Sequence, residues 1–193
     1  MALADSTFDT NIKAAFNKDQ WDDCANSLAS AIKSYIESGK VNTTVTATVT
    51  HPFPPGGSHV QTLHGINGTI TAPASSSLAN NIKIAFQSTA WASCASSLAS
   101  YVNTYFKQCT VSISSYSDAT GHGSSTSIAS DPGLAALITG ITSTFNLNSW
   151  DIAVTTLRTH IKTFITQTNI VKTTDSGSSP PQSWKGPGQG TIS

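Results

Sequence analysis

The 193-residue sequence has little charge: Lys and Arg together number 10, Asp and Glu also number 10, and the formal net charge is zero. Charged residues make up 10% of the chain, against roughly 25% in an average globular protein. Arg158 is the single arginine. Because neutralising phosphates requires clustered Lys and Arg, this composition argues against a nucleic-acid partner. It also excludes a highly charged disordered chain.

Long apolar runs and paired cysteines are also missing. No stretch approaches the ~18 apolar residues that cross a bilayer, so we expect no membrane partner. The N-terminal residues 1–5 lack the basic flank and the apolar run of a secretory signal peptide. Cys24, Cys94 and Cys109 are an odd number of cysteines without a CxxC spacing, which indicates a reducing compartment and no disulfide framework.

What the sequence does contain is hydroxyl side chains, 56 Ser and Thr in all, and an internal repeat. Nine positions recur without a gap, first after 70 residues and then after a further 59. The first set is Phe8, Ile12, Phe16, Trp21, Cys24, Leu28, Ile32, Tyr35 and Ile36. The second is Leu78, Ile82, Phe86, Trp91, Cys94, Leu98, Val102, Tyr105 and Phe106, and the third is Leu137, Ile141, Phe145, Trp150, Ala153, Leu157, Ile161, Phe164 and Ile165. The recurrence predicts three tandem units at 1–72, 73–130 and 131–193.

The spacing within each unit predicts its structure. In the first part of each unit the apolar residues are four positions apart, and after the Trp they are three or four positions apart. Both spacings put the apolar residues on one face of a helix, so each unit is expected to begin with two short helices joined by a tight turn. We expect the second helix to be capped two residues before each Trp, at Asp19, Thr89 and Asn148. A β-branched stretch, a Gly/Pro/Ser-rich loop (51–65 in the first unit) and a short closing strand follow. The predicted fold class is therefore α+β, with three helix–helix–β-hairpin repeats and an extended C-terminal arm.

The tryptophans at the repeated position have two interpretations. Because Trp21, Trp91 and Trp150 occupy the same position in the three units, we favour the interpretation that each is a buried anchor packed against its own helix pair. The alternative is an exposed aromatic platform that binds sugar. Cys24 and Cys94 share a position with Ala153, which is typical of a small packing site and not of a redox site.

The C-terminal segment 175–193 is predicted to be an assembly arm, because its Gly, Ser and Pro residues bury little apolar surface. An aromatic side chain on such a segment usually inserts into a core or a neighbour, so Trp184 is a candidate assembly contact. Thr191 and Ile192 are expected to add a strand to an existing sheet, in a neighbouring molecule in preference to their own.

Catalytic and metal-binding patterns are weak. His51, His59 and His64 share one Pro/Gly-rich segment, but a spacing of eight and five residues on a flexible loop argues against a metal site. The sequence has no Gly-x-Ser-x-Gly elbow, no phosphate-binding Gly-rich loop and no paired carboxylates at a defined separation. We therefore expect no enzyme activity, no catalytic residues, no metal and no cofactor.

The low charge, the Ser/Thr/Gly-rich composition, the lack of a catalytic motif and the final Gly-Gln-Gly-Thr-Ile at 188–192 resemble small structural proteins of tailed-bacteriophage virions. The resemblance covers the general character of the chain and its last residues. It implies a non-enzymatic component of the tail, baseplate or neck, or a capsid decoration, made in the host cytoplasm. Its partners would be other virion proteins and copies of itself. A carbohydrate-binding or host-adhesion module stays open as the alternative, as does a hydrolase with an unrecognised site.

Overall fold

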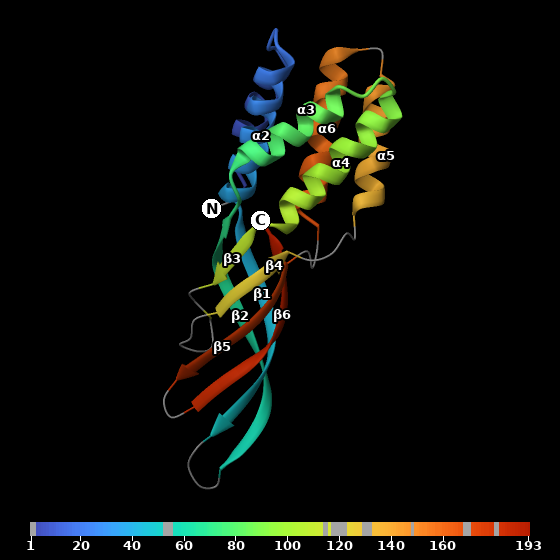
Figure 1. Ribbon diagram of the computed structural model, residues 1–193. Coiled ribbons are helices and arrows are strands. Elements are labelled where there is room, and N and C mark those ends of the chain that lie inside the picture. The colour runs from blue at the N-terminus through green and yellow to red at the C-terminus, as the bar shows by residue number, and fades with distance from the viewer. Residues whose placement is uncertain are drawn as a thin grey trace.

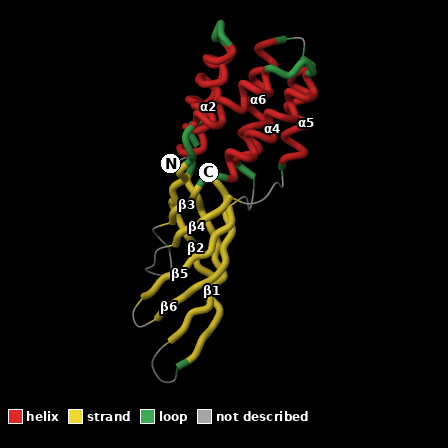
Figure 2. Tube along the Cα trace, viewed as in Figure 1, coloured by secondary structure: helices red, strands yellow, loops and turns green. Residues whose placement is uncertain are grey.

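The helices lie at one end of the molecule and the strands at the other, and both termini lie where the two parts meet (Figures 1 and 2). The structure is a computed structural model that describes residues 3–51, 56–113, 116, 123–128, 133–147, 149–167, 171–179 and 182–193. Within these ranges the side chains of residues 123–128, 150 and 171–184 are not described. The α+β class predicted from the sequence is confirmed.

Six helices are present in the described ranges, in three consecutive pairs. They are α1 (Asp5–Phe16), α2 (Trp21–Ser38), α3 (Ser75–Phe86), α4 (Trp91–Lys107), α5 (Leu134–Phe145) and α6 (Trp150–Ile165). Each helix packs against the next one in the chain, and α6 also contacts α1. The stripe of apolar residues predicted for each helix faces this bundle, as the buried Ile12, Leu28 and Leu98 show.

A pair of strands follows each pair of helices. The strands are β1 (Lys40–His51), β2 (Gly57–Thr71), β3 (Thr110–Ile113), β4 (Gly123–Ile128), β5 (Val171–Ser179) and β6 (Gln182–Ile192). The element order helix–helix–strand–strand therefore occurs three times. That the three are copies of one unit stays a prediction.

The sheet is antiparallel, with β1 at its centre. β1 pairs with β2 on one edge and with β6 on the other, and β6 also pairs with β5. These four long strands form a sheet in the order β2-β1-β6-β5. The short β3 and β4 connect β2 to β5 near the helices, so the strands close into a barrel there. Alternate residues of β1, including Val41, Val45 and Val49, are buried inside.

Two sequence-based expectations about the strands are wrong. The segment 51–65, predicted to be a loop, belongs largely to β2, which begins at Gly57. The segment 175–193 is not an extended arm, because β5 and β6 pair with each other as a hairpin and β6 pairs with β1. Hydrogen bonds in both directions between Lys40 and Ser193, of 2.8 and 2.9 Å, hold the end of the chain against β1. Pairing between distant strands supplies the order that the local composition does not.

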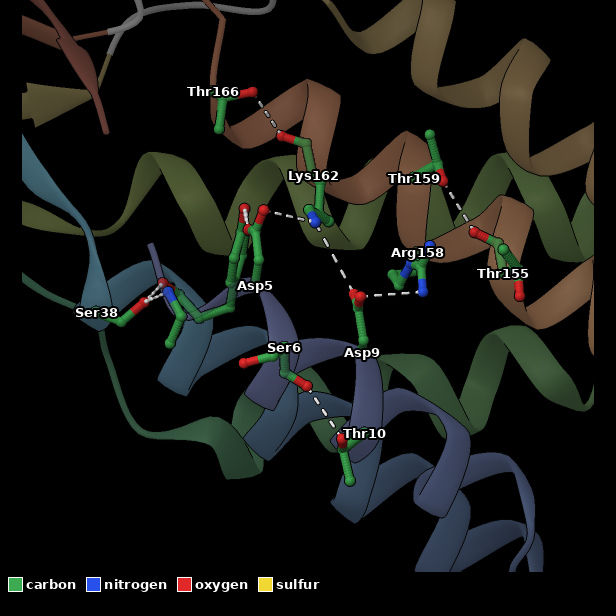
Figure 3. A network of polar contacts seen from close by, with 12 residues as sticks. Asp5, Ser6, Asp9, Thr10, Ser38, Thr155, Arg158, Thr159, Lys162 and Thr166 are labelled. Carbon is green, nitrogen blue, oxygen red and sulfur yellow. Dashed lines mark hydrogen bonds and ion pairs between the residues drawn. The ribbon is translucent and has the colours of Figure 1, made fainter. Parts of the chain in front are cut away.

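Charged residues join the first and last helices of the bundle, α1 and α6 (Figure 3). The Lys162 ammonium lies 2.8 Å from Asp5 Oδ2 and 3.9 Å from Asp9 Oδ1, and Arg158 Nη1 lies 3.1 Å from Asp9 Oδ2. The Lys162 ammonium, which donates a hydrogen bond to Asp5, lowers the pKa of that carboxyl. The Tyr35 hydroxyl donates a second hydrogen bond to Asp5, of 2.9 Å. The chain's only arginine therefore helps to close the ring of helices.

Replacing Lys162 by Met should destabilise the protein by about 1 kcal/mol at pH 7, the upper part of the range for partly exposed ion pairs. A carboxyl whose pKa is lowered in the folded state contributes stability at neutral pH and loses it as the pH falls through that lowered value. The cost of Lys162→Met should therefore shrink below the ordinary pKa of Asp5, near 3.8. Urea unfolding at pH 7 and pH 3 measures this, with the exposed Lys13→Met as control. An equal cost at both pH values would contradict the assigned role of Lys162.

Candidate functional site

The tips of the three helix pairs form an aromatic end to the molecule. In each pair the first helix ends at a Phe and the second begins at a Trp, with four residues between them. The residues before the Trp, Gln20, Ala90 and Ser149, are the N-caps and have extended backbone angles without a side-chain capping hydrogen bond. The caps predicted at Asp19, Thr89 and Asn148 are therefore misplaced by one residue.

Trp21 and Trp91 are exposed, at 61% and 65% of their surface, so the prediction that they are buried anchors is wrong. Each is the first residue of its helix. Because helical side chains tilt toward the N-terminus, a side chain at the first position projects beyond the end of the helix, away from the core. The side chain of Trp150 lies outside the described residues.

The two exposed indoles contact the neighbouring helix pair. The rings of Trp21, at the start of α2, and Phe86, at the end of α3, have centroids 5.4 Å apart. Trp91, at the start of α4, and Phe145, at the end of α5, repeat this contact at 5.7 Å. These separations are in the range of favourable aromatic pairs. The Trp of one pair and the Phe of the next therefore hold successive pairs side by side.

Between these rings lies a groove of about 370 Å³. Its apolar and aromatic lining consists of Phe16, Trp21, Phe86, Trp91, Phe145, Leu147 and Ala153. Two of the described lining residues carry hydroxyls, and each donates its proton to a backbone carbonyl, Thr144 to that of Gly140 at 2.9 Å and Ser88 to that of Ala90 at 3.4 Å. The described lining of this groove, which we call the aromatic groove, is thus mainly apolar and offers two hydroxyl oxygens as acceptors.

A second hollow adjoins the aromatic groove, since both are lined by Trp21 and Phe86. The exposed Asp22 and Asp23 line this hollow together with Lys83. Asp22 also pairs with Lys83 of α3, with 2.6 Å between Oδ2 and Nζ. A ligand that covers Trp21 would therefore meet carboxylates next to an apolar surface.

The three residues predicted to be assembly contacts all fall in β6. Thr191 and Ile192 pair with Asn42 and Val41 of the same chain, so the expected pairing with a neighbour is wrong. Ile192 is 3% exposed and belongs to the core. The backbone of Trp184 pairs with Val49 and Gly177, but its side chain lies outside the described residues, and its contact with a partner stays a prediction.

The cysteines are packed in the interior. Cys24, Cys94 and Cys109 are buried free thiols, and Ala153 at the equivalent third position is buried too. Burial raises the pKa of Cys24 to about 11 and that of Cys109 to about 12. At neutral pH both groups are therefore unreactive thiols.

The histidines are distributed over the fold. His51 and His59, on β1 and β2, lie next to each other, with 3.2 Å between His51 Nε2 and His59 Nδ1. His64 lies further along β2, opposite Thr44, and His160 packs over Gly140 of α5. His122 falls outside the described residues. Where side chains are described, no three or more His, Cys, Asp or Glu gather as metal ligands would.

No family model, no curated protein and no solved structure matches this chain. Of the helices described, none combines the length and the apolar character that a bilayer crossing requires.

Proposed function

We propose that this chain is a non-enzymatic structural component of a tailed-phage virion that acts through protein–protein contacts made by its aromatic groove. Its partners are other virion proteins and copies of itself, and its location is the tail, baseplate or neck. The observation that carries the proposal is the exposure of Trp21 and Trp91 beside an apolar groove. Exposed apolar surfaces of this kind mark interaction sites, and tryptophan is enriched among residues that dominate binding energy.

The chemistry of the aromatic groove favours an apolar protein segment. Stacking on Trp21 and Trp91 favours aromatic and aliphatic side chains, and the described lining adds only the hydroxyls of Ser88 and Thr144, whose protons are already donated to backbone carbonyls. The exposed carboxylate of Asp23, in the hollow beside Trp21, favours Lys or Arg next to that segment. The partner segment is thus apolar with a basic flank.

We also infer that the three helix pairs, with their strands, are tandem copies of one unit. The Trp-to-Phe contact between successive pairs supports this, as it occurs twice at equivalent positions. At the other end of the helices the equivalent Tyr35 and Tyr105 each donate a hydrogen bond near the start of the preceding helix, to the Asp5 carboxylate at 2.9 Å and to the Pro73 carbonyl at 2.7 Å. Three such units can match the threefold or sixfold symmetry of a tail.

The alternative function is a carbohydrate-binding or host-adhesion module. The exposed indoles of Trp21 and Trp91 favour it, because sugar rings stack on such surfaces. The lining of the groove favours it less, since sugar recognition also needs polar groups that reach the hydroxyls.

The test is the double variant Trp21→Ser/Trp91→Ser in the phage that encodes the chain. We expect the variant to stay folded, destabilised by no more than about 2 kcal/mol through loss of the two Trp–Phe contacts, and to be depleted at least tenfold from purified particles. Ile84→Ser is the matched control, because Ile84 is also exposed, at 55%, but does not line the groove. Quantitative mass spectrometry of the particles gives the readout.

Two outcomes would count against the proposal. Normal incorporation of the double variant would show that the groove is not the assembly surface. Binding of the wild-type chain to host-envelope glycans, abolished in the same variant while incorporation is retained, would favour the adhesion module.

A further inference from the structure

The β1–β2 hairpin reaches furthest from the helices (Figure 1), and two histidines meet near its end. His51 is the last residue of β1, opposite Gly57, and His59 of β2 stands opposite Val49. The two histidines are therefore diagonal neighbours on one face of the sheet. Their rings stack with centroids 5.1 Å apart and planes inclined by 20°.

The separation of the two nitrogens matches that of two ligands on one metal ion. His51 Nε2 and His59 Nδ1 are 3.2 Å apart. Two imidazole nitrogens bound to a tetrahedral Zn²⁺ at about 2.0–2.1 Å from the metal lie about 3.3–3.4 Å from each other. To bind one ion, both rings would have to turn from this hydrogen-bonding arrangement until each nitrogen lone pair points at the metal.

We propose that His51 and His59 form an open, two-histidine binding site for Zn²⁺ or a similar divalent transition-metal ion. No further His, Cys, Asp or Glu of the described side chains joins them as a third ligand, so water fills the remaining positions. Imidazole ligands select zinc, copper and nickel over Mg²⁺ and Ca²⁺, which prefer oxygen.

Both ligands are positioned by the sheet and not by a loop. β1 is a central strand, paired with β2 on one side and with β6 on the other up to Thr50. β2 is paired with β1 from Gly57 onward. Ligands on fixed strands lose less conformational entropy on binding than ligands on a mobile segment.

The surroundings do not repel a cation. On the same face of the hairpin the neighbouring positions are Val49, Gly57 and Gln61, none of which is charged. His59 is exposed and His51 half-buried, so both rings are accessible to ions from solvent. An ion bound here would join β1 to β2 at the far end of the molecule.

The experiment is a calorimetric titration of the untagged, full-length chain with Zn²⁺. We expect saturable binding of one ion per chain, weakened at least tenfold by either His51→Gln or His59→Gln. His64→Gln is the matched control, because His64 is an exposed histidine of the same strand on the opposite face, and it should bind as wild type does. Nitrogen chemical shifts should identify His51 Nε2 and His59 Nδ1 as the metal-bound atoms.

Circular dichroism checks that each variant folds, as expected for substitutions at accessible positions. Binding by His51→Gln and His59→Gln that equals wild type would overturn the proposal. So would wild-type binding no stronger than that of the double variant, in which case the two rings form a hydrogen-bonded pair only. Binding of Mg²⁺ with similar strength would also exclude a nitrogen-ligand site.

Discussion

Deletion of residues 182–193 is expected to unfold the protein. The deletion removes β6, which supplies pairing partners to both β1 and β5. It also removes the buried Ile192 and exposes the valines that face the interior from β1. Because a domain is stabilised by only about 5–15 kcal/mol in total, the loss of a strand from a closed sheet exceeds what the rest can offset. Circular dichroism and calorimetry of the truncated chain measure the effect.

A point substitution in β6 tests the strand pairing without shortening the chain. A Cβ atom at Gly186 would lie 2.0 Å from the Thr46 carbonyl oxygen and 2.6 Å from Ala47 Cα, both backbone atoms that cannot turn aside. Gly186→Ala should therefore destabilise the protein by about 1–3 kcal/mol, as overpacking does. Lys185→Ala, at the exposed neighbouring position, should have little effect. A truncated chain that still unfolds cooperatively would contradict the role assigned to β6.

The helices could be predicted from the sequence because their signals are local. Apolar residues at steps of three and four along the sequence fix the buried face, and each second helix begins at its Trp, one residue later than the predicted caps imply. Of the strands at 57–71 and 182–192, only the short closing ends at 68–71 and 190–192 could be predicted, because the glycines and prolines that precede them are typical of loops when considered alone. Gly186 and Gly190 instead lie where the backbone of β1 approaches to within 2.0 and 2.2 Å of a Cβ position. That requirement comes from a strand more than 130 residues away in the sequence.

The aromatic groove was not predicted as the candidate site, which the sequence analysis placed at Trp184, Thr191 and Ile192. The sequence identified Trp21 and Trp91 as equivalent residues, and equivalence suggested burial. Exposure follows from their position as the first residue of a helix, where the side chain projects beyond the end. The histidine pair was missed for a different reason, since His51 and His59 are brought together only by the register of a hairpin predicted to be a loop.

Substitution of the equivalent leucines Leu28, Leu98 and Leu157 by Ala should destabilise the protein strongly and to a similar extent. Their side chains are 0%, 0% and 1% exposed, one in the second helix of each pair. Replacing a fully buried Leu by Ala typically costs 2–5 kcal/mol, about as much as the total stability of a marginal domain. If the three units are copies of one another, as we propose, the three costs should agree to within about 1–2 kcal/mol. Urea unfolding of the three variants measures them.

Trp21→Ala is the matched comparison, because it removes a larger side chain from the start of the helix that carries Leu28. Because 61% of the Trp21 surface is exposed, Trp21→Ala should lower the free energy of unfolding by no more than about 1 kcal/mol, mostly through the lost contact with the Phe86 ring. Leu28→Ala should therefore destabilise the protein more than Trp21→Ala does, although the Trp side chain is the larger one. A cost for Trp21→Ala equal to that of Leu28→Ala would mean that the indole is a structural anchor. The aromatic groove would then be part of the core and not a surface for a partner.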